Sequence, residues 1–298
     1  MSSPFMTSEE LAEILGRLDR GEQSVHHGAT RSISREPIRE LIDDLKALLF
    51  PHCATAGQHP GSPAHQAAQE VFGGLVRIIH QVSLHNCDES PTCVEQAHSG
   101  ALAREFFEAL PTIQEEALTD AQAAFEGDPA ARGLVEIIST YPGFYATLAY
   151  RLAHRLHQQG IPLLPRMMTE IAHSDTGIDI HPAAHIGLYF FIDHGTGVVI
   201  GETTQIGDRV TLYQGVTLGA LNFPHDQEGR IIRGAKRHPT IEDDVVIYSE
   251  ATILGGDTVI GHHSVIGGNV WLTESVPPFS KVTTKSTIAL RTRKDPVT

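Results

Sequence analysis

Residues 179–218 read DIHPAAHIGLYFFIDHGTGVVIGETTQIGDRVTLYQGVTL, and the spacing of their aliphatic side chains decides the fold. An aliphatic residue recurs every six positions, first as Ile180, Ile186, Ile192 and Val198, then as Ile200, Ile206, Leu212 and Leu218. The six-residue spacing returns further on, at Ile241, Ile247 and Ile253, and, after a slip of one residue, at Ile260, Ile266 and Leu272. A helix repeats every 3.6 residues and a strand every two, whereas a six-residue period is typical of a parallel β-helix. We therefore predict stacked triangular coils of about 18 residues that bury continuous aliphatic columns.

One long segment, residues 219–240, interrupts this period. It reads GALNFPHDQEGRIIRGAKRHPT and is too polar and too rich in glycine to form another coil. Long loops in compact domains are more often functional than not. We expect a loop that leaves the solenoid and returns at Arg237-His238-Pro239, directly before the repeats resume.

Upstream of the repeats the spacing is that of helices. Apolar residues at Ile38, Leu41, Ile42, Leu45 and Leu48 lie on one helical face. Similar patterns run from Ala67 to Leu84, from Ala101 to Phe125 and from Tyr145 to His157, with a break at GDPAARG, residues 127–133. The chain is predicted to be α+β, with a helical domain over 1–175, a β-helix over 176–280 and a tail over 281–298.

The composition excludes several function classes. Lys and Arg number 22 against 36 Asp and Glu, a net charge of −14, which disfavours nucleic acid and anionic membranes as partners. No stretch approaches the ~18 apolar residues of a membrane span. The N-terminal residues lack the layout of a signal peptide, and three cysteines, an odd number, indicate reduced thiols. We expect a cytoplasmic protein.

Four segments around the long loop strongly resemble the serine O-acetyltransferase family. They are DIHPAAHIG at 179–187, FIDHGTGVVIGET at 191–203, VTLGA at 216–220 and KRHPTI at 236–241. GDPAARG and GFYATLAYRLAH at 143–154 resemble the junction that precedes that family's solenoid, so that the resemblance covers about residues 115–275. It implies a left-handed parallel β-helix. It also implies acetyl transfer from acetyl-CoA to L-serine, which gives O-acetyl-L-serine and CoA in the first step of cysteine biosynthesis.

The reaction requires a base, because a serine hydroxyl is a poor nucleophile at neutral pH. We predict that His194 accepts its proton, since an unperturbed imidazole is largely neutral there. A carboxylate that fixes the tautomer improves such a base. Asp179 precedes His194 by 15 residues, nearly one coil, and the family resemblance assigns the same pair.

The amino-acid substrate has two charged groups to be recognised. Arg237 offers a guanidinium fork for the carboxylate, with His238 beside it. The resemblance assigns Asp193 and Asp128 to the ammonium group. Asp128-Pro129 is also a typical helix start, because Asp is a good N-cap residue and Pro suits the first turn.

Acetyl-CoA is the expected co-substrate, and no metal is expected. The family binds the pantetheine arm mainly through backbone groups at the coil edges, and the matching positions are Ala220, Ser249 and Gly268. The resemblance further implies a homo-oligomer, either a trimer or a dimer of trimers.

The sequence departs from the family in two places that bear on partners. The family usually has LGG where this chain has Leu218-Gly219-Ala220, followed by a longer loop. The familiar tail ends in isoleucine and enters the active site of O-acetylserine sulfhydrylase. This chain ends at Thr298, which argues against a complex of that kind.

Three alternatives stay open at this point. The first is a hexapeptide acetyltransferase that acts on a sugar or another amino alcohol, which would not need Arg237 for a carboxylate. The second is a γ-type carbonic anhydrase with zinc on three histidines, although His181, His185 and His194 do not follow that ligand pattern. The third is a non-catalytic trimeric scaffold.

Overall fold

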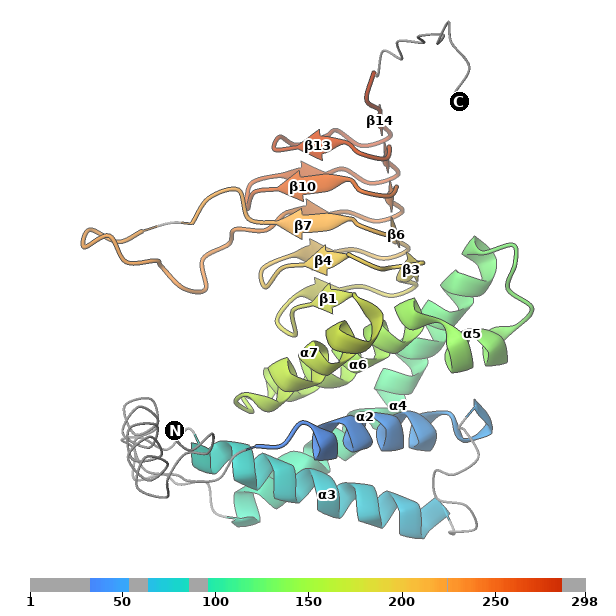
Figure 1. Cartoon of the computed structure of the whole chain (residues 1–298), viewed down its shortest axis with the longest axis vertical. Helices are drawn as coiled ribbons and strands as arrows, with labels where there is room; N and C mark the ends of the chain where they lie inside the picture. Colours follow the sequence, from blue (N-terminus) through green and yellow to red (C-terminus); the bar gives the residue numbers. More distant parts are fainter. Residues whose placement is uncertain (1–32, 54–63, 86–95, 224, 286–298) are drawn as a thin grey trace, which may run out of the picture.

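The computed structural model describes residues 33–53, 64–85, 96–223 and 225–285. Helices form a layered domain at one end of the molecule, and a tapering stack of short strands rises from it (Figure 1). The helical domain followed by a parallel β-solenoid of about five turns confirms the predicted fold class. Cys53 is a free thiol, while Cys87, Cys93 and residues 286–298 lie outside the described residues.

The helical domain contains the predicted segments. Its helices are α2 (Glu36–Leu49), η1 (Pro51–Cys53), α3 (Ala64–His85), α4 (Gln96–Gly127), α5 (Leu134–Thr140), α6 (Pro142–Gln158) and α7 (Leu164–Thr176). The predicted break at 127–133 separates α4 from α5. None of the helices in the described part of the chain is long and apolar enough to cross a membrane.

Local sequence explains where these helices begin and what they bury. In α2, five apolar side chains at helical spacing are buried against α3, and a proline occupies the first turn. Prolines also begin α6 and α7. Gly177, with φ +73°, ends α7 in the left-handed conformation that glycine adopts without strain. The chain then enters the first coil two residues later.

The solenoid has fourteen described strands in three parallel sheets. They are β1 (Asp179–Ile180), β2 (His185–Ile186), β3 (Phe191–Asp193), β4 (Val199–Ile200), β5 (Gln205–Ile206), β6 (Thr211–Tyr213), β7 (Thr217–Gly219), β8 (Thr240–Ile241), β9 (Val246–Ile247), β10 (Thr252–Leu254), β11 (Val259–Ile260), β12 (Val265–Ile266), β13 (Trp271–Leu272) and β14 (Lys281–Val282). Sheet A has the order β1-β4-β7-β10-β13, sheet B β11-β8-β5-β2 and sheet C β14-β12-β9-β6-β3.

The register of these sheets places the six-residue repeat in columns. In sheet A, Ile180 lies opposite Ile200, which lies opposite Leu218. Equivalent columns run through sheets B and C, and all but Leu272 of the repeating aliphatic residues are buried. The predicted core is therefore confirmed. The domain boundaries themselves stay predictions, and strand pairing reaches β14, just beyond the boundary predicted at residue 280.

Two corners of the triangular coil matter for the site. We call the turns between sheets C and A the His194 corner (residues 194–198, 214–216, 248–251 and 267–270). The turns between sheets A and B are the Arg237 corner (residues 181–184, 201–204, 220–239 and 255–258). Figure 1 shows them on opposite sides of the face formed by β1, β4, β7, β10 and β13.

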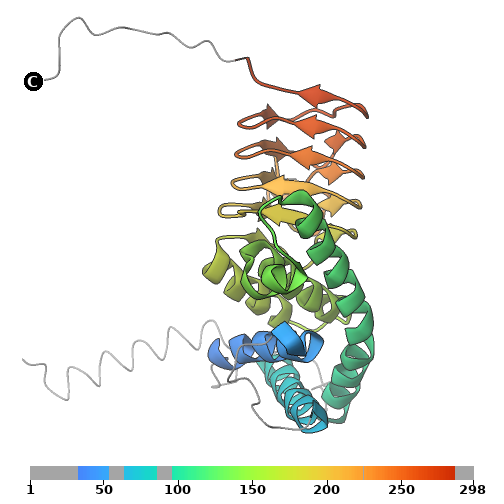
Figure 2. The same cartoon turned by 90° about the vertical axis from the view of Figure 1, so that its right-hand side faces the viewer.

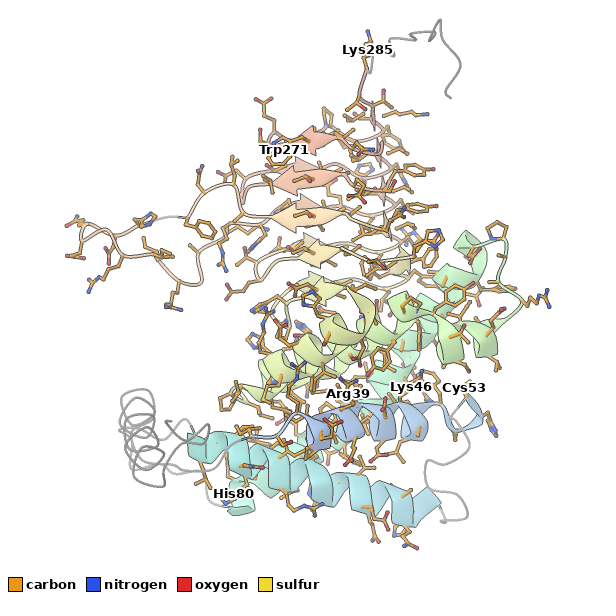
Figure 3. All side chains as sticks on the ribbon, in the orientation of Figure 1. Arg39, Lys46, Cys53, His80, Trp271 and Lys285 are labelled. Atoms are coloured by element: carbon orange, nitrogen blue, oxygen red, sulfur yellow. The ribbon has the colours of Figure 1, made fainter. Side chains whose placement is uncertain are left out.

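The long loop, residues 220–239, projects from the Arg237 corner as an arm (Figures 1 and 3). A bridge between His225 and Ile231 closes its tip, and Asp226 accepts hydrogen bonds from the backbone of Glu228 and Arg230. The coil continues across the insertion, because β8 pairs with β5 on one side and β11 on the other. A loop in this position is what the sequence predicted.

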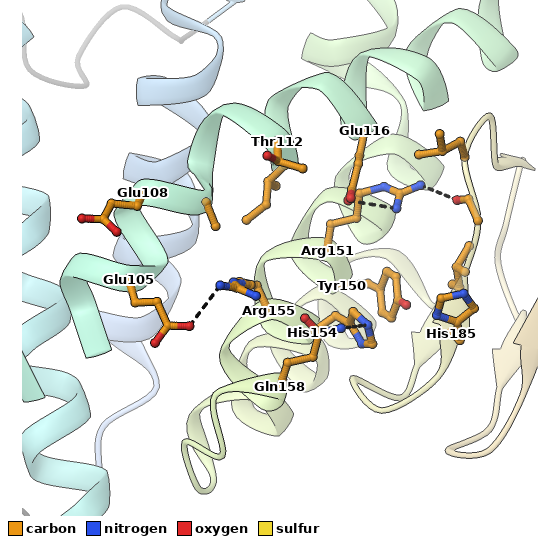
Figure 4. Close-up of a pocket in the computed structure, with 15 residues that line it drawn as sticks. Glu105, Glu108, Thr112, Glu116, Tyr150, Arg151, His154, Arg155, Gln158 and His185 are labelled. Carbon is orange, nitrogen blue, oxygen red and sulfur yellow. Dashed lines mark hydrogen bonds and ion pairs between the residues drawn. The ribbon is translucent and has the colours of Figure 1, made fainter. Parts of the chain in front are cut away.

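A buried ion pair joins the helical domain to the first coil. Arg151 of α6 binds Asp120 of α4 through two hydrogen bonds of 2.6 and 2.8 Å. It also donates to the Gly187 carbonyl at 2.8 Å (Figure 4). Asp120 in turn accepts the Phe190 N–H at 3.0 Å. Both charges are satisfied, as a buried pair requires. These bonds fix the first coil of the solenoid against α4. Figure 2 shows this helix curving along one side of the molecule.

Candidate active site

The His194 corner carries the predicted base. Strand β3 ends at Asp193, and His194 adopts φ +60°, a left-handed conformation that recurs at other turns of the solenoid, for example at Arg209 and His263. Its side chain is 72 % exposed, and Nδ1 lies 3.6 Å from Oδ1 of Asp193. Gly195 allows the turn, since a Cβ there would lie 2.4 Å from the Ile178 side chain. The imidazole is therefore presented outward, with Asp193 as its neighbour.

Asp128 reaches the same corner from the helical domain. It follows α4 and accepts a 2.6 Å hydrogen bond from the Tyr141 hydroxyl and a 2.8 Å bond from the Ala130 N–H. These two bonds, and more weakly the nearby His194, hold the pKa of Asp128 below its usual range. The same bond raises the pKa of Tyr141 to about 12. The structure thus brings Asp128, Asp193 and His194 together within one chain.

Asp179 begins β1, at the edge of the same corner, and has another partner. Arg166 of α7 lies 3.7 Å from its carboxylate and 2.5 Å from that of Glu170. Within the described residues, no hydrogen bond or ion pair joins Asp179 to His194, so the predicted dyad stays a prediction. Glu170, His173 and Asp179 are close enough to share a metal ion, but the Arg166 guanidinium already supplies the positive charge there.

The Arg237 corner holds the residues predicted to bind a carboxylate. Arg237 donates to the carboxylate of Glu202 on the coil below, and the two side chains are 20 % and 31 % exposed. Burial raises the pKa of Glu202, but the hydrogen bond and charge of Arg237 outweigh it, and the net shift is downward. The guanidinium is therefore fixed in direction before any substrate arrives.

His238 is packed against Gly201 of the coil below, where a Cβ would lie 2.1 Å from the imidazole ring. Its Nδ1 accepts the Thr203 N–H at 3.1 Å, and the Thr203 hydroxyl lies at 2.8 Å. Burial first, and the Arg237 charge second, lower the pKa of His238 to about 4. A neutral ring with an accepting Nδ1 carries its proton on Nε2. His238 is thus a fixed hydrogen-bond donor.

The predicted acetyl-CoA residues divide between the two corners. Ser249 and Gly268 lie at the His194 corner on successive coils, and a Cβ at Gly268 would come within 3.0 Å of the Ser249 carbonyl oxygen. Ala220 begins the arm at the Arg237 corner. Both corners would therefore have to contribute to one cofactor site.

The three histidines that suggested a carbonic anhydrase do not converge. His181 lies at the Arg237 corner, His185 on sheet B and His194 at the His194 corner. Burial lowers the pKa of His181 to about 4, and its Nδ1 accepts the Ala183 N–H. Within one chain these positions do not form a three-histidine zinc site.

Sequence reasoning missed three partners of the predicted residues: Tyr141 for Asp128, Glu202 for Arg237 and Arg166 for Asp179. Glu202 and Thr203 belong to GET, the end of the segment at 191–203 that resembles the serine O-acetyltransferase family. That resemblance was the one feature of the sequence that pointed to them. A cavity of about 630 Å³ between α4 and α6 contains none of the predicted residues. Its polar walls are largely paired, for example Arg155 with Glu105 at 3.0 Å (Figure 4).

Known proteins share this architecture. No family model matches the chain. A relative from Synechococcus elongatus named "Serine acetyltransferase, plasmid" is 47 % identical over 263 residues, which are 83 % of this chain and 80 % of the relative. The solved Entamoeba histolytica serine acetyltransferase 1 in complex with L-cysteine matches with a TM-score of 0.72 and 38 % identity, over 85 % of this chain and 88 % of that one.

A solved serine acetyltransferase in complex with CoA matches with a TM-score of 0.53 and 25 % identity, over 84 % of this chain and 96 % of that one. Fold and relatives together define the class of this protein as an acyltransferase built on a β-solenoid. More narrowly, the chain belongs to the serine acetyltransferase family.

Proposed function

We propose that this protein transfers the acetyl group of acetyl-CoA to the hydroxyl of L-serine and thereby begins cysteine biosynthesis. The observation that carries the proposal is the convergence of Asp128, Asp193 and the exposed His194 at one corner. Two carboxylates beside a free imidazole suit a substrate whose ammonium group and hydroxyl lie close together. The relatives that share the fold bear the name of this reaction.

The mechanism follows from these positions. A ring nitrogen of His194 accepts the serine hydroxyl proton as the oxygen attacks the thioester carbon. The tetrahedral intermediate then collapses, the carbon–sulfur bond breaks, and the proton passes from the imidazolium to the departing CoA sulfur. Asp128 and Asp193 hold the ammonium group, and Asp179 would stabilise the imidazolium from the adjacent edge.

The site would be completed by a neighbouring copy of the chain. Arg237 and His238 lie at a different corner from His194, so a single chain does not present both halves to one substrate. A ring of three copies would place the Arg237 corner of one beside the His194 corner of the next. Such a head-to-tail interface closes without leaving a half-site unused. A trimer, or a pair of trimers, is the proposed assembly.

The first experiment measures thioester loss from acetyl-CoA with the purified protein. L-Serine is compared with homoserine, threonine and simple sugars as acceptors. Selective turnover with serine supports the proposal. Activity only on a sugar or on another amino alcohol would contradict the acceptor while retaining the class of reaction.

A second experiment tests the shared site. His194→Ala and Arg237→Ala chains are each expected to be inactive, and co-expression should restore activity. With random mixing, roughly a quarter of the interfaces in a ring pair an intact His194 with an intact Arg237. A mixture as inactive as its components would show that both residues serve one chain's own site.

A further inference from the structure

A pair of tyrosines lies directly above the predicted ammonium site. Tyr213 pairs with Asp193 in the register of β3 and β6, and Tyr248 occupies the corresponding position after β9. Their rings stack with centroids 5.0 Å apart and planes 10° apart. Tyr248 is 44 % exposed, so the outer ring face is open to a ligand.

The adjacent column contains an unsatisfied acceptor. Gln214 follows Tyr213 as His194 follows Asp193, so it stands one coil above His194. Its Oε1 is buried and has no hydrogen-bond partner among the described residues. An unpaired buried acceptor is costly, and each one calls for a missing donor. Ser249 continues the column on the next coil.

The direction from which a ligand can approach this corner limits the chemical identity of the missing donor. Asp128 closes the helical side of the corner, and the amino acid's ammonium group already has two carboxylates there. The thioester must therefore reach His194 from the opposite side, along the coils that carry Gln214 and the tyrosines. Its arm contains amide N–H groups and uncharged methylene and methyl groups, which match an unpaired acceptor and an aromatic face.

The spacing of the coils fits this arm. Neighbouring strands lie about 4.8 Å apart, so Gln214 stands about one such step above the reacting sulfur and Tyr248 about two. Two methylenes separate the sulfur from the first amide nitrogen, which places that N–H near the level of Gln214. The remainder of the arm then passes the Tyr213–Tyr248 stack.

We propose that the Gln214 amide turns toward the pantetheine arm and accepts its first amide N–H, and that Tyr213 and Tyr248 form the wall against which the rest of the arm packs. These are binding residues for the thioester, additional to the backbone positions at Ser249 and Gly268. The proposal rests on acetyl-CoA being the donor in the proposed function.

The test compares variants of the full-length protein. CoA binding is measured by calorimetry, and KM is measured separately for acetyl-CoA and for serine. Gln214→Leu and Tyr248→Ala should each weaken CoA binding roughly tenfold, the range for one lost hydrogen bond or aromatic contact. The KM for serine and the melting temperature should stay near the wild-type values. Tyr248→Phe, which keeps the ring, should bind CoA as the wild type does.

Trp271→Ala is the matched control, because this aromatic side chain is 67 % exposed on sheet A, away from the column. It should leave CoA binding unchanged. A truncated donor, S-acetyl-N-acetylcysteamine, keeps the first amide and lacks the rest of the arm. With it, Gln214→Leu should retain its penalty and Tyr248→Ala should lose it.

Two outcomes would overturn the inference. One is wild-type CoA affinity in both Gln214→Leu and Tyr248→Ala. The other is an equal loss of CoA and serine affinity with a lower melting temperature, which would show that these residues support only the fold. A wild-type protein that binds CoA, shows the expected losses in the variants and yet does not acetylate serine would contradict the proposed function alone.

Discussion

The two corners of the solenoid that carry the predicted site are organised in opposite ways. At the His194 corner the key side chain is exposed, held in a left-handed turn and lightly paired, with Asp193 at 3.6 Å. At the Arg237 corner the cation is already paired with Glu202, and the histidine beside it is buried and bonded to Thr203. A base must be free to gain a proton, whereas a recognition group works best when fixed beforehand. The difference is consistent with the roles proposed for His194 and Arg237.

Removing the base is expected to have the largest effect. His194→Ala should lower kcat by about 10³-fold, in the range for general-base catalysis, with little change in melting temperature because the side chain is exposed. Steady-state kinetics with serine and acetyl-CoA measure it.

His263→Ala is the control for that variant. His263 shares the left-handed conformation, at φ +56°, and lies 3.5 Å from Asp244, but on another corner of the coil. It should leave kcat unchanged. Comparable losses in both variants would mean that exposed histidines in such turns support the fold rather than the reaction.

Changing the shape of the cation should have the next largest effect. Arg237→Lys keeps the charge but loses the fork, so we expect the KM for serine to rise by about 10- to 100-fold with a smaller change in kcat. Arg230→Lys, at the tip of the arm, is the matched control, since within the described part of the chain Arg230 forms ion pairs with its neighbours Asp226 and Glu228 alone. An unchanged KM in Arg237→Lys would remove Arg237 from the carboxylate site.

A smaller effect is expected from releasing Asp128. Tyr141→Phe removes the 2.6 Å hydrogen bond and lets the carboxylate turn, which should raise the KM for serine by roughly threefold to tenfold. Tyr189→Phe, an exposed tyrosine at a third corner, serves as the control. If kcat fell and KM did not change, Asp128 would act on the reaction rather than on binding.

The smallest effect is expected in the way the free energy of unfolding changes with pH. The pKa of His238 falls from 6.5 to about 4 in the folded chain, so the unfolded chain binds more protons in between. Stability should therefore be full above about pH 6.5 and decline toward pH 4. His181, with a similar shift, adds to the decline, while Arg237, Glu202 and Lys236 face the same group.

His238→Asn keeps an acceptor near the Nδ1 position and does not titrate. Melting temperatures at pH 7.5, 5.5 and 4.5 should fall less for this variant than for the wild type. If the melting temperatures of the variant and the wild type fell equally as the pH is lowered, the buried imidazole would not be the cause of the loss of stability in acid.

The six-residue period predicted the coils, because each strand is defined by one inward side chain and the columns follow from stacking. Contacts that depend on the helices were not predictable in this way. Tyr141, which follows α5, reaches back to Asp128 at the end of α4, and Arg166 reaches Asp179 from α7. The Tyr213–Tyr248 stack is equally hidden, since the arm separates its members in the sequence.

The continuity of sheet B across the arm has a consequence for how such proteins diversify. Ile206 of β5 pairs with Ile241 of β8 in the regular register, although the arm lies between them in the sequence. The pairing of the coils is therefore independent of the length of the arm. Insertions at this point are nearly neutral for the scaffold, while Arg237 and His238 lie at their base. The arm can therefore change in length or sequence while the aliphatic columns of the core stay the same, and such changes would alter the proposed acceptor site. The solenoid is a constant scaffold, and the loops inserted at its corners can be exchanged separately.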